Sequence, residues 1–81
     1  MGADSTTTAA LRDELRVVEE QLTQLRQTAA ELRRRVGEHG DGPTDSAERS
    51  TLITEAEEQE AFMEVLERRR EDLLRRLGES R

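Results

Sequence analysis

The chain contains no cysteine, lysine, tryptophan or tyrosine, and it has one proline and one aromatic residue, Phe62. The absence of cysteine excludes disulfide bonds and thiolate zinc sites. The scarcity of aromatic residues argues against a β-sandwich or barrel, whose strands rely on aromatic and β-branched side chains. No apolar run approaches the length of a membrane span or of a signal-peptide core. We therefore expect a soluble, cytoplasmic protein without a cofactor or a metal site.

Charged residues make up 40% of the 81 residues and hydrophobic residues only 32%, a composition close to that of disordered chains. The net charge of −6 is unevenly distributed. Residues 1–36 carry six acids and six arginines, whereas residues 37–64 carry nine acids against Arg49 alone (net −8). Residues 65–81 carry four acids and six arginines (net +2). The acidic middle argues against duplex DNA or an anionic membrane as the main partner and favours a basic or metal-bearing protein partner.

Regular spacing of apolar residues distinguishes the chain from a disordered one. The first stripe has steps of three and four and comprises Leu11, Leu15, Val18, Leu22, Leu25, Ala29, Leu32 and Val36. The second stripe has the same spacing with two polar interruptions and comprises Leu52, Ala56, Gln59, Met63, Leu66, Arg70, Leu73 and Leu77. Such heptad spacing predicts coiled-coil helices. We expect them near residues 6–37 and 44–78, after a flexible segment at 1–7 and before a tail at 79–81.

The segment between the two stripes, residues 38–43, is rich in glycine and holds the only proline, which predicts a turn. Gly37 suits a left-handed position just after the first helix. Asp45, followed three residues later by Glu48, is typical of a helix start with a capping box. A short turn between two heptad helices predicts an all-α, antiparallel two-helix coiled-coil hairpin over residues 8–77. Two such hairpins can dimerise into a four-helix bundle.

The register of the hairpin is predicted by letting residues whose numbers add to 81 face one another. The resulting apolar pairs are Ala29 with Leu52, Leu25 with Ala56, Val18 with Met63, and Leu15 with Leu66. Cysteines introduced at 25 and 56 are then expected to form a disulfide, and cysteines at 25 and 63 are not. On the flanks, Glu14 meets Arg69 and Arg26 meets Glu60, while Glu19 lies unfavourably near Glu60.

This seam between the helices is thin, since Leu22 faces Gln59 in the predicted register and Leu11 faces an arginine. Ile53, Phe62 and Leu74 lie beside the second stripe, at e and g positions of the heptad, and widen its apolar face. Uncovered apolar surface of this kind marks contact sites. We therefore predict that these three residues form the surface for a homodimer or for docking onto a larger partner.

Three acids, Asp41, Asp45 and Glu48, gather at the turn. Carboxylates on the end of a thin rod can enter a deep pocket, where they contact basic residues or share a Mg²⁺ ion with the partner. In the alternative interpretation, Asp41 is a turn former and Asp45 is a helix cap. The chain offers no nucleophile–base set of an enzyme, and we expect no enzymatic activity.

The basic runs and the single histidine also have plain structural interpretations. Arg33–Arg35 can bind phosphate or an acidic groove, or can complement the negative end of the first helix. Arg68–Arg70 is typical of a solvated face, because acids interleave with it and no aromatic residue is available for base stacking. His39 has no cysteine or nucleophile to act with and is expected to be a solvated loop residue.

The turn resembles the tip of a known class of coiled coils. Glu38-His39-Gly40-Asp41, followed by Asp45-Ser46-Ala47-Glu48, is similar to the tip of the Gre transcript-cleavage factors. Pro43-Thr44-Asp45-Ser46-Ala47 is similar to the Asp-Pro-x-Asp-x-Ala tip of the DksA/TraR factors. In both families the coiled coil enters the secondary channel of bacterial RNA polymerase, where the tip acids act near the catalytic magnesium or modulate initiation. The resemblance implies that Asp41 and Asp45 are tip acids.

The resemblance extends roughly over residues 8–77, but its specific part is the turn, and the chain lacks the cysteines of the DksA/TraR zinc finger. Our first hypothesis is a non-enzymatic transcription regulator that binds RNA polymerase through its acidic tip. The alternative is a homo-oligomeric coiled-coil adaptor or scaffold that mediates protein–protein interaction and whose acidic tip is merely solvated.

Overall fold

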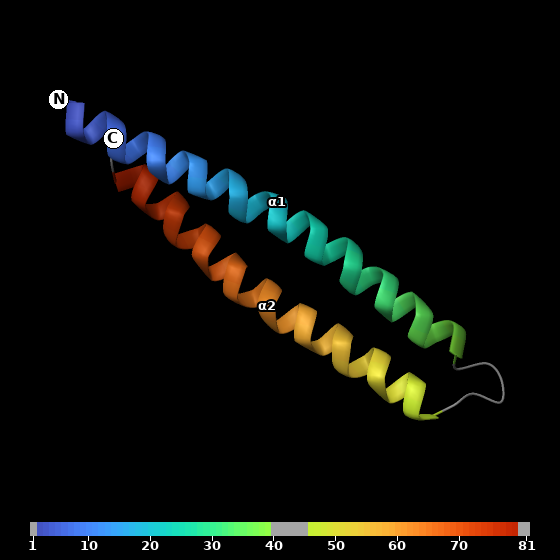
Figure 1. Ribbon diagram of the computed structural model, residues 1–81. Helices are drawn as coiled ribbons and strands as arrows, with labels where there is room; N and C mark the ends of the chain where they lie inside the picture. Colours follow the sequence, from blue (N-terminus) through green and yellow to red (C-terminus); the bar gives the residue numbers. More distant parts are fainter. Residues whose placement is uncertain (1, 40–45, 80–81) are drawn as a thin grey trace.

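The computed structural model describes two long helices, α1 (Gly2–His39) and α2 (Ser46–Glu79), and the side chains of residues 7–38 and 46–79. The helices run antiparallel and pack along their length, so that the start of α1 and the end of α2 lie at the same end (Figure 1). The Cα atoms extend over 66 Å along the resulting rod and 14 Å across it. The predicted all-α helical hairpin is confirmed.

The first helix is longer than the heptad stripe predicted, and the second starts two residues later and ends one residue later than predicted. α1 starts at Gly2 and continues past Gly37 to His39, and α2 extends to Glu79. The prediction that Gly37 ends the first helix in a left-handed conformation is wrong, because no glycine in the described part of the chain has a positive φ. A glycine costs only about 1 kcal/mol relative to alanine inside a helix, which the neighbouring hydrogen-bonded turns offset.

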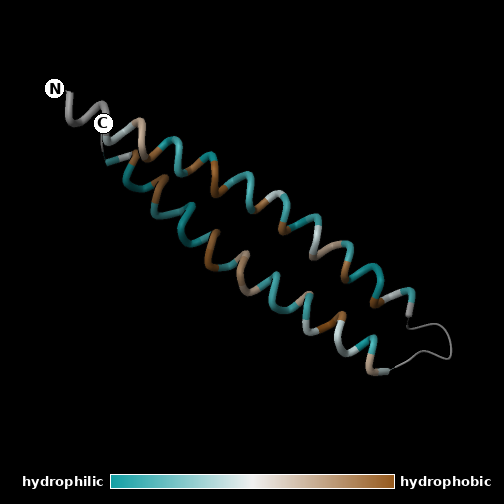
Figure 2. The backbone as a smooth tube through the Cα atoms, viewed as in Figure 1, coloured by the Kyte–Doolittle hydropathy of each residue, from teal (hydrophilic) through white to brown (hydrophobic). Residues whose placement is uncertain are grey.

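The core of the hairpin consists of two separate apolar clusters. The first is built around the buried residues Val18, Leu22, Leu66 and Leu73, with Leu11, Leu15, Leu25 and Met63 packed against them. The second, nearer the turn, consists of Leu32, Leu52 and Ala56, with Val36 packed against them. In Figure 2, hydrophobic segments recur along both tubes, largely where the helices face one another. Half-buried Gln59 takes its place in the α2 stripe between the two clusters.

The apolar contacts correct the predicted register by one heptad. Leu25 packs in the same cluster as Met63 and not with Ala56, which lies in the second cluster together with Leu32. The residue numbers of Leu25 and Met63, and those of Leu32 and Ala56, add to 88 instead of 81. Each α2 residue therefore faces an α1 residue seven positions further along than we predicted.

The ion pairs between the helices give the same result. Arg26 lies 3.9 Å from Glu67, and Glu60 pairs instead with Arg33 at 2.6 Å, so the predicted pairing of Arg26 with Glu60 is wrong. The predicted contact between Glu14 and Arg69 is present. It survives the shift because it lies on the opposite flank, where facing residues have numbers that add to a smaller total.

The shifted register buries Leu22 more completely and gives Glu19 and Glu60 partners of opposite charge. In the predicted register Leu22 faces Gln59, whereas in the structure it is fully buried in the cluster that contains Leu66. The predicted repulsion between Glu19 and Glu60 is replaced by attraction, since each acid now has an arginine partner from the other helix. Exposed ion pairs contribute only about 0–1 kcal/mol each, so the apolar contacts dominate the choice of register.

Candidate interaction surfaces

The predicted tip residues fall mainly outside the described part of the chain. Asp41 and Asp45 belong to residues 40–45, whose arrangement the structure does not describe. Glu48 lies in the first turn of α2 with an exposed side chain, where a carboxylate complements the positive end of the helix. Among the described residues, no group of three His, Cys, Asp or Glu side chains is placed to hold a metal ion.

The three arginines that precede the turn are engaged in ion pairs. Arg33 donates to Glu60 of α2 at 2.6 and 3.1 Å, and this hydrogen bonding lowers the pKa of Glu60. Arg34 donates to Glu31 at 2.7 Å and to Glu38 at 3.2 Å, and Arg35 lies 3.6 Å from Glu31. The hydrogen bond from Arg34 is the main reason that the pKa of Glu31 is lowered. Each of the three arginines thus has a carboxylate partner within the chain, from α2 for Arg33 and from α1 for Arg34 and Arg35.

One flank of the rod is covered by ion pairs between the helices. These are Arg33 with Glu60, Arg26 with Glu67, and Arg70 with Glu19, and we call this side the ion-pair flank. Arg70 occupies a seam position of α2, but its side chain leaves the seam to reach Glu19 at 3.1 Å. A surface hollow of about 250 Å³, which is lined by Glu19, Leu22, Thr23, Arg26 and Arg70, lies beside it. The hollow is polar and its two arginines already have carboxylate partners, so it offers no free charge to a ligand.

The predicted contact residues Ile53, Phe62 and Leu74 lie on two sides of the rod. Ile53 and Leu74 are spaced by whole heptads from Glu60 and Glu67, which places them on the ion-pair flank near opposite ends of α2. Ile53 is half-buried and Leu74 is 42% exposed. Phe62 precedes Arg69 by one heptad and therefore lies on the other side, where Arg69 meets Glu14.

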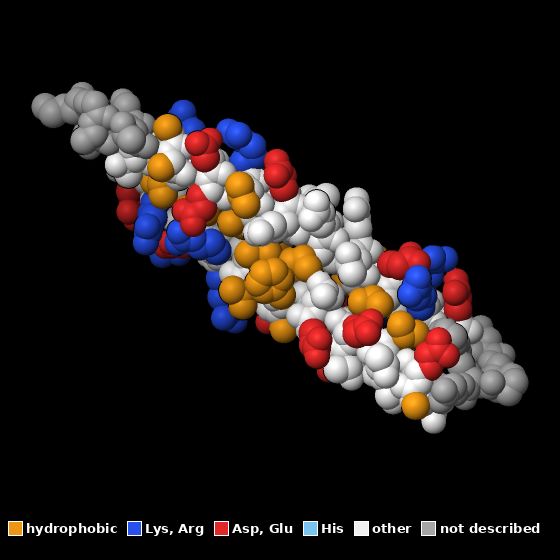
Figure 3. Space-filling model, in the orientation of Figure 1, with side chains coloured by type: hydrophobic (Ala, Val, Ile, Leu, Met, Phe, Trp, Pro, Cys, Tyr) orange, Lys and Arg blue, Asp and Glu red, His pale blue; other side chains and the backbone are white. Residues whose placement is uncertain are grey.

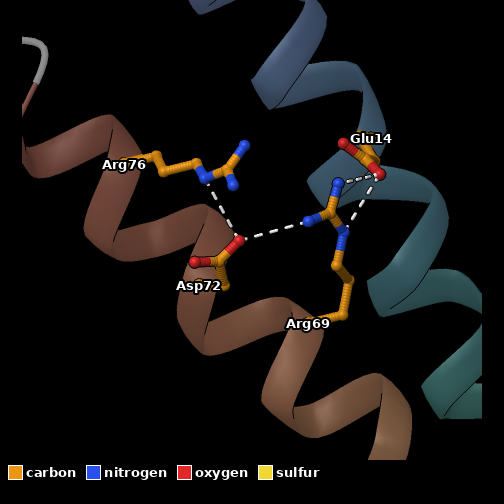
Figure 4. A network of polar contacts seen from close by, with 4 residues as sticks. All are labelled: Glu14, Arg69, Asp72 and Arg76. Carbon is orange, nitrogen blue, oxygen red and sulfur yellow. Dashed lines mark hydrogen bonds and ion pairs between the residues drawn. The ribbon is translucent and has the colours of Figure 1, made fainter.

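That other side begins with a charge network near the chain ends. Arg69 bridges the helices by donating to Glu14 of α1, and it also donates to Asp72 at 3.1 Å. Arg76 lies 3.2 Å from the same Asp72 carboxylate (Figure 4). The hydrogen bond to Glu14 raises the pKa of Arg69. The contact shows that Glu14 of α1 and Arg69 of α2 lie side by side on this side of the rod.

Two exposed valines that the sequence prediction missed lie one helical turn from this network. Val17 follows Glu14 by three residues and Val65 precedes Arg69 by four, so both lie on the same side of the rod as that ion pair. Val17 is 51% exposed, Val65 56% and Phe62 48%. The close sequence spacing of Phe62 and Val65 could have indicated Val65, but neither valine belongs to a heptad seam position. Together with Gln21, one heptad after Glu14, they form what we call the open flank.

The α1 side of the open flank lacks charge over a considerable length. On α1, its exposed stripe continues from Val17 through Gln21, Gln24 and Thr28 without a charged residue. In Figure 3, a group of hydrophobic side chains lies near the middle of the visible face, with charged side chains towards both ends of the rod. In a chain of which 40% is charged, such an uncharged stretch is the feature that departs most from an ordinary solvated surface.

Comparison with known proteins does not assign the chain to a family. No family model matches the chain, and no curated protein or solved structure matches it either. The resemblance of the turn to the Gre and DksA/TraR tips thus stays a prediction made from the residues of the turn. The described helices contain no stretch that is long and apolar enough to cross a membrane.

Proposed function

We propose that this chain is a non-enzymatic protein that acts by binding other proteins, with the rod as its working part. The observation that carries this proposal is the shape: a single pair of helices, 66 Å long and 14 Å across at the Cα atoms. Over its described residues, this rod has a polar surface hollow of about 250 Å³, which differs from the concave, largely apolar pockets that bury small substrates. It does present an end and two flanks, which are surfaces suited to protein partners.

Within this class, we propose regulation of transcription by insertion of the acidic turn into RNA polymerase. The turn carries Asp41 and Asp45, and α2 adds Glu48 in its exposed first turn. The rod is 14 Å across at the Cα atoms over a length of 66 Å, so it is a slender element. Carboxylates on its end could reach basic residues or a metal ion at the bottom of a deep channel.

This proposal is tested with Asp41→Asn and Asp45→Asn together, because asparagine preserves size and caps a helix about as well as aspartate. The matched control is Glu64→Gln with Glu71→Gln, which removes two charges from exposed positions of α2 far from the turn. We expect the tip variant to lose polymerase binding and its effect on transcription in vitro, and the control to retain both. Circular dichroism checks that both variants stay helical. If the unaltered protein does not bind polymerase, or the tip variant binds equally well, the tip proposal is wrong.

A second candidate function, a self-associating adaptor or scaffold, is favoured by the open flank. Val17, Phe62 and Val65 are about half exposed and share one side of the rod. Under this function the tip variant is silent, and substitutions on the open flank abolish partner binding. The two candidate functions therefore make opposite predictions for the tip variant and for substitutions on the open flank.

A further inference from the structure

We propose that the open flank is the interface with a second copy of this chain, and that the two rods pack antiparallel to form a four-helix bundle. The proposal rests on Val17, Gln21, Phe62 and Val65 and does not depend on what the acidic turn binds. A monomeric result would leave the polymerase proposal standing. The proposal assigns the dimer to one flank, whereas the sequence prediction drew its contact residues from both.

The first argument is the distribution of apolar surface. The described part of the chain has four exposed large hydrophobic residues, of which Val17, Phe62 and Val65 lie on the open flank and Leu74 on the other. The ion-pair flank is already occupied by three contacts between α1 and α2. Covering this flank would remove those charges from water, which is unfavourable unless the partner supplies new hydrogen bonds to each of them. Among the described residues of the open flank, the ion pairs between the helices are confined to the network around Arg69, so this cost falls on one part of that flank and spares the surface around Phe62.

The second argument is the area that a stable dimer needs. Each partner in a stable interface buries roughly 800 Å². The rod measures 66 by 14 Å at its Cα atoms, so one whole flank is comparable with this requirement. A small foreign segment would cover only part of it. A second rod matches its length, and a helical hairpin of about 80 residues gains much from added burial, because its own core supplies only about 3–5 kcal/mol.

The third argument, charge complementarity, sets the orientation. A parallel pair would place Glu58, one helical turn before Phe62 on the open flank, beside Glu58 of its partner. An antiparallel pair, centred on Phe62 and Val65, places Glu58 at the level of Arg69 of the second copy instead. Like charges at close range disfavour the parallel arrangement, and the unlike charges favour the antiparallel one.

The test combines the molar mass with three single substitutions to glutamate. Light scattering over a concentration series up to about 100 μM is expected to give twice the monomer mass, since interfaces of this size are stable in that range. Phe62→Glu is expected to return the monomer mass. The matched controls are Ala61→Glu, on the adjacent exposed position that points away from the flank, and Leu74→Glu, on the ion-pair flank. Both controls are expected to remain dimeric, and circular dichroism checks the helicity of all three variants.

The orientation is tested with a spin label on a single cysteine at Thr51, near the turn end of α2. The chain has no other cysteine, so labelling is unambiguous. With a rise of about 1.5 Å per residue, the two labels of an antiparallel dimer are expected to lie about 35–40 Å apart, against about 10 Å in a parallel dimer. The proposal is overturned by a protein that is monomeric at every concentration or by a Phe62→Glu dimer. Loss of the dimer in either control, or a short label distance, also overturns it.

Discussion

The burial of Leu22 makes it the most informative position for testing the register. Leu22 is fully buried in the first cluster, beside Leu66 and Leu73. Replacing a buried leucine by alanine costs about 2–5 kcal/mol, because the lost apolar contacts are compounded by a cavity that a packed core closes only partly. A hairpin of this size has about 3–5 kcal/mol in total. We therefore expect Leu22→Ala to remove most of the stability of the isolated hairpin.

The expected loss of stability corresponds to a measurable unfolded fraction. If Leu22→Ala leaves about 1 kcal/mol, about one chain in six is unfolded before any denaturant is added. The assay is urea unfolding followed by circular dichroism, run at low protein concentration because association stabilises the folded state by mass action. The control is Thr23→Ala, on the neighbouring exposed position, for which we expect a change within about 0.5 kcal/mol.

The outcome discriminates between the two registers. In the register that the heptads alone predicted, Leu22 faces Gln59 and is only partly enclosed. A cost below about 1 kcal/mol for Leu22→Ala would therefore show that the side chain is not in a closed core. That result would refute the one-heptad shift, together with the assignment of Leu22 to the cluster that contains Leu66.

Two further predictions follow from the register and the ion pairs. Cysteines that replace Leu25 and Met63 are expected to form a disulfide in the monomer, and cysteines that replace Leu25 and Ala56 are not, which reverses the expectation from the sequence. Mass spectrometry after oxidation measures which bond forms. A bond between positions 25 and 56 would contradict the structure. The pKa of Glu60 lies below its usual 4.5 because Arg33 donates to the carboxylate, so the pair stabilises the fold above pH 4.5 and this contribution is lost as the pH falls through the lowered pKa. Glu60→Gln should therefore lower the melting temperature at neutral pH and have little effect in acid, and an equal effect at both would contradict this reasoning.

Both helices and their apolar faces could be predicted from the sequence because the signal is local. A residue such as Leu22 or Leu66 repeats with its neighbours at heptad spacing, and that spacing is set by the geometry of the α-helix alone. The Glu31–Arg35 and Asp72–Arg76 pairs were predictable for the same reason, since residues four apart in a helix are always neighbours. The candidate acids at the turn were likewise found from the sequence, though Asp41 and Asp45 lie outside the described residues.

The register and the open flank depended on the tertiary structure. A heptad repeat looks the same after a shift of seven residues, so the periodicity that placed Leu22 in the seam could not say whether it faced Gln59 or Leu66. The choice required comparing whole sets of pairs at once, including the change from Glu19 beside Glu60 to an arginine partner for each. Val17 was invisible for a related reason: it is unremarkable along α1 and becomes part of a surface only beside α2. The amino-acid sequence by itself determined which faces of the helices are apolar, because that property belongs to each helix alone. Only the packing of the two helices decided which residues face one another and which remain open to a partner, because the contact energy depends on the side chains of both helices together.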